Sequence, residues 1–178
     1  MLKINNTNKR IYNFFKNWLI PVITAIVISL LIQKFIFFNV YLPPSGSMIP
    51  TLNNNDRALV SRIYNIDNDN RGSIFVFYSE ELNERLVKRL IGLPGDKIEI
   101  KNGVIFVNST QLNENYVKNN NIYNGTFEVP EGKYFFLGDN RAISYDSRFW
   151  KNPYIDSSDI KGKLQFRFYP LKDFGTVK

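Results

Sequence analysis

KIEIKNGVIFV, residues 97–107, decides the fold class of this chain. Polar and apolar side chains alternate on both sides of Asn102-Gly103, a dipeptide that favours the two-residue turn of a β-hairpin. Similar short runs recur, separated by turn signals, at residues 58–66, 73–78, 85–92, 126–129, 133–138 and 163–170. The sequence therefore predicts a mainly β fold of antiparallel strands.

A polar interruption divides these strand runs between about residues 102 and 132. Its centre, residues 113–124, is rich in asparagine and has the composition of a solvated loop. We expect residues 102–132 to form a small inserted β lobe. A chain of 178 residues has room for one modest domain and an appendage.

A long apolar stretch precedes the strands. WLIPVITAIVISLLI begins at Trp18 and carries no charge. The predicted span, residues 18–38, contains roughly 20 residues, enough at about 1.5 Å per residue to cross a hydrocarbon core of about 30 Å. Basic residues and no acids precede it: Lys3, Lys9, Arg10 and Lys16. The positive-inside rule then places residues 1–17 in the cytoplasm and the domain 39–178 outside a plasma membrane that the chain crosses once.

Two other structures share this apolar pattern. A cleaved secretory signal would end in small residues, whereas residues 33–42 are bulky. A buried core helix would need a helical partner, and the downstream sequence predicts strands. An uncleaved anchor is therefore favoured, and the lipid bilayer is a predicted partner.

Composition excludes several kinds of chemistry. Of the formal charge of +7, residues 1–20 carry +4, and residues 35–178 hold 18 basic and 16 acidic side chains, so no basic stripe predicts nucleic-acid binding. Cysteine and histidine are absent, which excludes disulfides, thiol nucleophiles, the usual zinc sites and a Ser-His-Asp triad. We expect neither a metal nor a cofactor.

The first candidate for catalysis is Ser47 in PPSGSMIPTL, residues 43–52. A serine between prolines is by itself most often part of a turn. Its position just beyond the predicted span would suit a membrane-tethered substrate. A nucleophilic serine needs a base, and without histidine the candidate is an unprotonated lysine.

The candidate base is Lys88 in RLVKRLI. Strand alternation places Leu86, Lys88 and Leu90 on one face and Arg89 on the other, where we expect a structural role. Burial between leucines would lower the pKa of Lys88, because the charged amine loses its hydration. The alternative is a surface lysine on an edge strand.

A third polar cluster, GDNRAISYDSR at residues 138–148, follows an apolar strand run. It supplies the hydroxyl of Ser144, the carboxylate of Asp146 and the guanidinium groups of Arg141 and Arg148. Such groups can orient a lysine and hold a loop in place.

Taken together, PSGSMIPTL (44–52), VKRLIGLPGD (87–96) and GDNR followed by SYDSR (138–148) resemble the motifs of bacterial type I signal peptidases, serine peptidase family S26, in the family's order. The resemblance implies an antiparallel β catalytic domain of the signal-peptidase type. It also implies a serine endopeptidase with a Ser-Lys dyad. Such an enzyme removes signal peptides from secreted preproteins after A-x-A-like sites and uses no cofactor.

The same resemblance assigns roles by position. Ser47 matches the nucleophile, Lys88 the general base, and Ser45 the hydroxyl that joins the Ser47 N–H in the oxyanion hole. Ser144 matches the hydroxyl that binds the lysine, and Asp146 and Arg148 match supporting positions. The positions that match the shallow apolar substrate pockets are Pro44, Met48, Leu52, Leu86 and Val87.

Two departures from the family's pattern stand out. Ala142 and Ile143 replace the residues that commonly precede Ser144, and Arg71-Gly72-Ser73 replaces RGD. Both bear on supporting hydrogen bonds, since the nucleophile, base and orienting serine are intact.

Two competing functions remain open from the residues. A self-cleaving repressor of the Ser-Lys type would need a DNA-binding domain and a soluble start. A catalytically silent assembly factor would typically lack the serine or the lysine, and both are present.

Overall fold

The computed structural model describes residues 6–66 and 70–177, and the chain divides into two compact units between Phe37 and Phe38. The first unit is helical: α1 spans Asn6–Phe14, a π-helical turn spans Phe15–Leu19 and α2 spans Ile20–Phe35. Residues 1–5 of the predicted cytoplasmic segment, including Lys3, lie outside the described residues.

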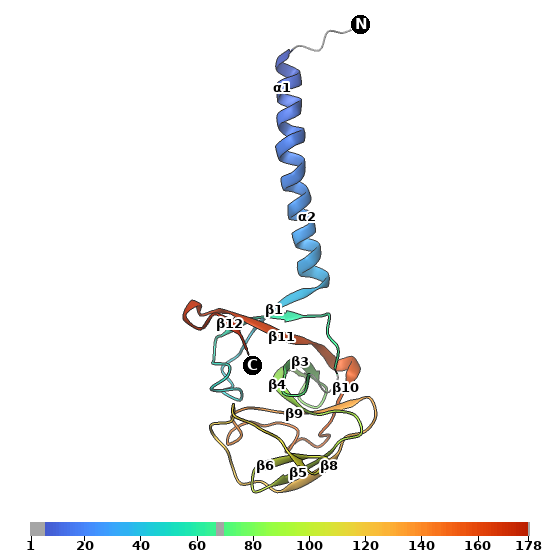
Figure 1. Ribbon diagram of the computed structural model, residues 1–178, viewed down its shortest axis with the longest axis vertical. Coiled ribbons are helices and arrows are strands. Elements are labelled where there is room, and N and C mark those ends of the chain that lie inside the picture. The colour runs from blue at the N-terminus through green and yellow to red at the C-terminus, as the bar shows by residue number, and fades with distance from the viewer. Residues whose placement is uncertain (1–5, 67–69, 178) are drawn as a thin grey trace. The chain divides into compact units, whose positions relative to one another are not determined.

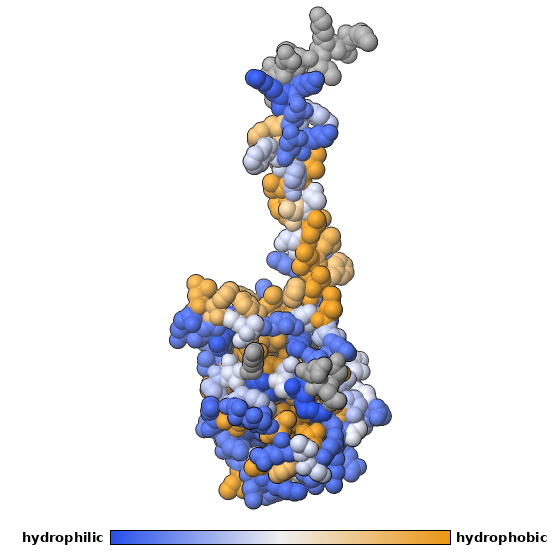
Figure 2. Space-filling model, viewed as in Figure 1, coloured by the Kyte–Doolittle hydropathy of each residue, from blue (hydrophilic) through white to orange (hydrophobic). Residues whose placement is uncertain are grey.

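This helix is long and apolar enough to cross a membrane over Tyr12–Phe35, by length and composition. Figure 2 shows apolar side chains along the visible face of α2 and polar ones on the turns before it. None of its most apolar window is buried, which argues against the core-helix alternative.

The second unit contains an antiparallel sheet with the strand order β1-β2-β11-β3-β4-β9-β10, and β12 also pairs with β11 (Figure 1). The strands are β1 (Phe37–Tyr41), β2 (Arg57–Ser61), β3 (Ile74–Ser79), β4 (Glu84–Gly92), β9 (Lys133–Leu137), β10 (Ile155–Asp156), β11 (Ile160–Tyr169) and β12 (Gly175–Thr176). Two 3₁₀ turns, Ser157–Asp159 and Leu171–Asp173, flank β11. The mainly antiparallel β prediction is confirmed.

A second sheet, ordered β7-β6-β5-β8, contains the hairpin that the sequence predicted. Ile100 pairs with Ile105, and both Asn102 (φ 51°) and Gly103 (φ 81°) have the positive φ that a type I′ turn requires. This sheet begins at Lys97, before the expected start of the lobe at residue 102. Its strands are β5 (Lys97–Lys101), β6 (Val104–Val107), β7 (Thr110–Gln111) and β8 (Gly125–Glu128).

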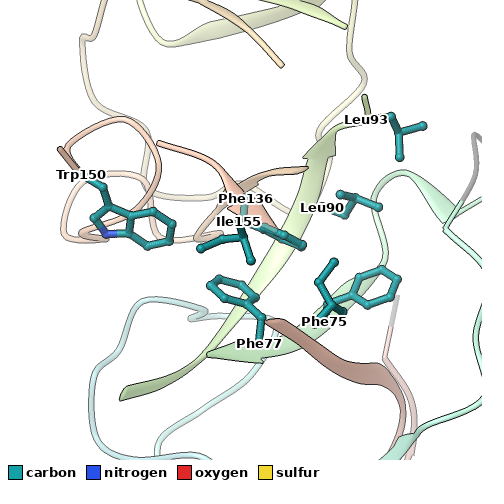
Figure 3. Packing of buried hydrophobic residues seen from close by; sticks show 8 residues of the cluster. Phe75, Phe77, Leu90, Leu93, Phe136, Trp150 and Ile155 are labelled. Atoms are coloured by element: carbon teal, nitrogen blue, oxygen red, sulfur yellow. The ribbon is translucent and has the colours of Figure 1, made fainter. Parts of the chain in front are cut away.

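The largest group of buried aromatic side chains comes from β3, β9 and the loop after β9, and Leu90 of β4 belongs to the same cluster (Figure 3). The rings of Phe77 and Phe136 stack with centroids 4.5 Å apart, and Trp150 meets Phe77 edge-on at 6.1 Å. Each such ring buries a large apolar area and favours a fixed ring geometry. These contacts make β4, which carries Lys88, part of a rigid sheet interior.

Several strands differ from the sequence prediction: β11 begins at Ile160 rather than at residue 163, and the short strands β7, β10 and β12 were not predicted. β2 ends at Ser61 rather than at residue 66, because the Ser61 hydroxyl donates to the Ile63 carbonyl and accepts from the Ile63 N–H, which turns the chain locally. β1 was not predicted, although its sequence FFNVY has the aromatic and β-branched composition of a strand.

Candidate active site

Ser47 lies in a tight turn of the loop between β1 and β2. Leu42 closes this loop, since its N–H donates to the Asp56 carbonyl (3.0 Å) and its carbonyl accepts from the Asn55 N–H (3.1 Å). Met48 and Leu52 anchor the turn in an apolar cluster. The turn is therefore held at both ends, and the Ser47 side chain has little freedom.

Three features of the Ser47 turn bear on chemistry. Ser47 is 7% exposed, and its hydroxyl lies 3.3 Å from that of Ser45. The Ser47 N–H donates no hydrogen bond to any group in the described ranges 6–66 and 70–177. The hydroxyl of the candidate nucleophile Ser47, the hydroxyl of Ser45 and an N–H that donates no described hydrogen bond thus lie close together.

Lys88 lies in the interior of the main sheet, on β4 between β3 and β9. It is 3% exposed and pairs across the sheet with Phe75. Leu86 and Leu90, which share its face, belong to the cluster around Phe75. The alternative of a surface lysine on an edge strand is therefore wrong.

The Lys88 amine has one hydrogen-bond partner among the described residues, the Ser144 hydroxyl at 3.2 Å. Burial lowers the pKa of Lys88 from 10.5 to about 8. Asp146, Glu84 and Asp139 oppose this effect and Arg148 adds to it. None of the described carboxylates forms an ion pair with the amine, so much of it is neutral near pH 8.

Gly138 lets the third motif approach the first. A Cβ at Gly138 would lie 2.1 Å from the Ser144 hydroxyl and 2.6 Å from the Ser47 carbonyl oxygen. The Asn140 N–H donates to this carbonyl at 3.0 Å, and the Asn140 amide donates to the Gly46 carbonyl at 3.2 Å. The loop that presents Ser144 is thus bonded directly to the turn that presents Ser47.

Asp146 and Arg148 hold the Ser144 loop from within. Arg148 binds both carboxylate oxygens of Asp146, at 2.8 and 3.0 Å, and also donates to the Ser144 carbonyl at 3.4 Å. The Gly138 N–H donates to Asp146 at 3.0 Å. Both residues are buried, so this pair fixes the loop and does not contact the cleft.

A second buried ion pair lies next to Gly138. Arg89 binds both oxygens of Asp139, at 2.8 and 2.6 Å, and donates to the Gly72 carbonyl. Gly72 belongs to the Arg71-Gly72-Ser73 segment, whose Arg71 pairs with Asp96 at 2.5 Å. The departure from RGD thus leaves this segment bonded to β4.

Ser47 and Lys88 line one cleft, with a volume of about 220 Å³. Met48, Leu52, Leu86 and Val87, which match the family's substrate pockets by position, line this cleft. Pro44 does not line it, and its neighbour Pro43 does. The described residues contain no group of three or more carboxylates that could hold a metal ion.

Sequence reasoning missed several apolar side chains of the cleft wall: Leu42, Pro43, Leu82, Ile143 and Tyr145. Ile143 and Tyr145 come from the third motif. They bracket Ser144, and the Ile143 side chain lies against Gly46, where an added Cβ would approach it to 3.2 Å. Ala142 donates its N–H to the Asn119 carbonyl at 3.1 Å. The replaced residues before Ser144 are therefore packed and bonded. The signal that could have identified them is a large apolar residue on each side of Ser144 in an otherwise polar loop.

The chain matches a family model and several known proteins. The family model "Signal peptidase, peptidase S26" matches residues 15–169. Signal peptidase I of Bacillus licheniformis is 36% identical over 97% of both chains, and signal peptidase IB of Staphylococcus aureus is 37% identical over 88% of this chain and 91% of its own. A crystal structure of a signal peptidase I from Enterococcus faecalis is 34% identical, covers 57% of this chain and 100% of its own, and superposes with a TM-score of 0.49.

Ser47 and the buried Lys88 line one cleft in a chain without histidine, an arrangement compatible with the serine hydrolases that work without imidazole. The chain belongs to the signal peptidase family, peptidase S26. It is a serine endopeptidase.

Proposed function

We propose that this protein removes N-terminal signal peptides from secreted preproteins, with Ser47 as the nucleophile and Lys88 as the general base. The observation that carries the proposal is the buried Lys88 amine, which lines the same cleft as Ser47 and whose pKa is lowered to about 8. The relatives named signal peptidase I support the substrate class.

In the proposed mechanism, the Ser47 oxygen bonds to the carbonyl carbon of the residue before the cut. The Lys88 amine accepts the proton of the Ser47 hydroxyl. The C–N bond then breaks, and Lys88 returns the proton to the leaving amine. A water molecule, deprotonated by Lys88, displaces Ser47 from the acyl-enzyme, so serine and lysine are regenerated.

The oxyanion of each tetrahedral intermediate would be held by the Ser47 N–H and the Ser45 hydroxyl. The N–H is uncommitted and the two hydroxyls are 3.3 Å apart, so both donors can point at one oxygen. Ser144 would keep the amine directed toward the cleft through its 3.2 Å hydrogen bond.

The described hydrogen bonds do not include one between Ser47 and Lys88; these side chains bond to Ser45 and Ser144 instead. Catalytic hydrogen bonds often tighten only in the substrate complex. We infer that the Ser47 hydroxyl turns from Ser45 toward Lys88 when a substrate carbonyl enters the cleft.

Aliphatic side chains narrow the cleft and favour small residues before the cut. Met48, Leu52, Leu86 and Val87 supply this wall. A single surplus methylene group changes specificity by about 10- to 200-fold, so a precursor with leucine in place of the alanine before the cut should be processed far more slowly. Equal rates would contradict the assigned pocket.

We further propose that the helix anchors the enzyme in the plasma membrane with its N-terminus in the cytoplasm. The chain has no cysteine, so a single Glu131→Cys probe in the catalytic unit is unambiguous. An impermeant maleimide should label it on intact cells from which the cell wall has been removed. Labelling only after lysis would show that the catalytic unit lies in the cytoplasm and would contradict the proposed orientation.

The activity test compares the full-length protein in detergent with two variants, using a purified precursor. Ser47→Ala and Lys88→Ala should each lower the cleavage rate by about 10⁴-fold or more. The exposed Lys172→Ala serves as the matched control and should cleave normally. Equal cleavage by wild type and Lys88→Ala would refute the assigned base, and no cleavage by wild type would favour the assembly-factor alternative.

A further inference from the structure

The asparagine-rich segment, residues 113–124, contacts the third motif along its length and is not merely a solvated loop. We call it the strap. It leaves the second sheet after β7 and returns to it at β8. Its contacts with residues 138–148 come from side chains and backbone alike, at Glu114, Asn119, Asn121 and Tyr123.

The strongest of these contacts joins Glu114 to Arg141. Both carboxylate oxygens accept from the guanidinium, at 3.1 and 2.5 Å, and the two side chains are 11% and 2% exposed. Arg141 also donates to the Gly138 carbonyl at 2.9 Å. Gly138 packs against the hydroxyl of Ser144, so Glu114 acts on the Ser144 loop through Arg141.

Tyr116 extends this contact to β4. Its hydroxyl donates to Glu114 at 2.8 Å, and its ring covers the Arg89 guanidinium at 3.8 Å. Burial and the Glu114 carboxylate raise the pKa of Tyr116, so its hydroxyl remains a donor. The strap therefore also contacts the residue next to Lys88 in the chain.

The far end of the strap holds the other side of the Ser144 loop. Asn119 accepts from the Ala142 N–H at 3.1 Å, and the Asn121 side chain accepts from Arg148 at 3.0 Å. The Tyr123 hydroxyl donates to the Arg148 carbonyl at 2.9 Å. The departure at residue 142 thus falls where the strap supplies a backbone partner.

We propose that the strap is a positioning element for the catalytic lysine, and that Glu114 is its principal positioning residue. This inference rests on the proposed function, because it assigns a role relative to Lys88 as the base. The strap holds the loop of residues 138–148 in place. This loop orients Lys88 through Ser144 and shields the Lys88 amine from water. Glu114 does not line the cleft, so it does not touch the substrate.

The proposal makes a prediction that a purely structural role does not. Loosening the strap admits water to the Lys88 amine, which raises its pKa from about 8 toward its ordinary value. The pH at which the cleavage rate rises should then be higher than in wild type. The charged groups that face Lys88 are Asp146, Arg148, Glu84 and Asp139, and Glu114→Gln removes none of them.

The test measures kcat and KM against pH for full-length Glu114→Gln, with exposed Glu131→Gln as the charge-matched control. Glu114→Gln should lower kcat on the order of tenfold near neutral pH and leave KM within about twofold. The pH profile of kcat should shift to higher pH, so the difference in kcat from wild type should shrink at alkaline pH. Glu114→Asp should restore part of the rate.

A Glu114→Gln profile that matches the control, or one lowered equally at every pH, would overturn the proposal. If Glu114→Gln does not fold, Tyr123→Phe removes one strap hydrogen bond and should show a smaller shift in the same direction; no shift would overturn it. Failure of wild type to cleave, or activity in Lys88→Ala, would instead refute the proposed function.

Discussion

Each face of β4 buries one basic side chain, and these neighbours in the chain, Lys88 and Arg89, have opposite kinds of surroundings. Arg89 is 1% exposed and meets Asp139 through two hydrogen bonds, with the Gly72 carbonyl and the Tyr116 ring as further partners. Lys88 is 3% exposed and has one hydroxyl as its hydrogen-bond partner among the described residues.

The difference separates a structural charge from a reactive one. A buried charge with a bidentate counter-ion stays charged, and its removal leaves the counter-ion uncompensated. A buried amine with a neutral hydrogen-bond partner has a lowered pKa, because the loss of hydration of the charged form outweighs the effects of the nearby charges. The same depth of burial thus gives a fixed ion pair on one face and an amine with a lowered pKa on the other.

The largest effect on stability should come from Arg89→Met. Asp139 is fully buried and would lose its guanidinium partner, which should lower the free energy of unfolding by about 3–5 kcal/mol. Urea unfolding of the full-length protein in detergent, followed by tryptophan fluorescence, measures this loss, because Trp150 is buried in the main core.

The control for Arg89→Met is the double variant Arg89→Met with Asp139→Leu, which removes both charges. It should recover much of the lost stability, since well-packed apolar pairs often replace buried ion pairs without cost. A single variant as stable as wild type would break the contrast between the two cations.

Lys88→Met should have a smaller effect of the opposite sign, stabilising the protein by about 2 kcal/mol at neutral pH while abolishing cleavage. Between about pH 8 and 10.5 the native state binds fewer protons at Lys88 than the unfolded state, so wild-type stability rises with pH across this window. The advantage of methionine should therefore be full below about pH 8 and fade toward pH 10.5. Unfolding curves at several pH values test this, and a destabilised Lys88→Met would contradict it.

Local patterns in the sequence predicted the hairpin and the position of Lys88. The Asn102-Gly103 turn depends on two adjacent residues, and the shared face of Leu86, Lys88 and Leu90 depends on alternation within one strand. Both are settled by short-range geometry, which a sequence shows directly.

The strap and the cleft wall depend on contacts between distant residues. Glu114 and Arg141 are 27 positions apart, and the polar composition of residues 113–124 is equally typical of a solvated loop. The wall of the cleft takes Pro43 rather than Pro44, because the orientation of each side chain in a proline-rich turn depends on backbone angles that periodicity does not determine.

The pH dependence of precursor cleavage by the full-length enzyme tests the central claim most directly. If the neutral Lys88 amine is the base, kcat/KM should be low in acid, rise as the pH passes about 8 and then level off. Two results would contradict the account. One is a rate that is constant from about pH 6 to about pH 10, roughly two units either side of the Lys88 pKa. The other is a rate that rises only near the ordinary pKa of lysine.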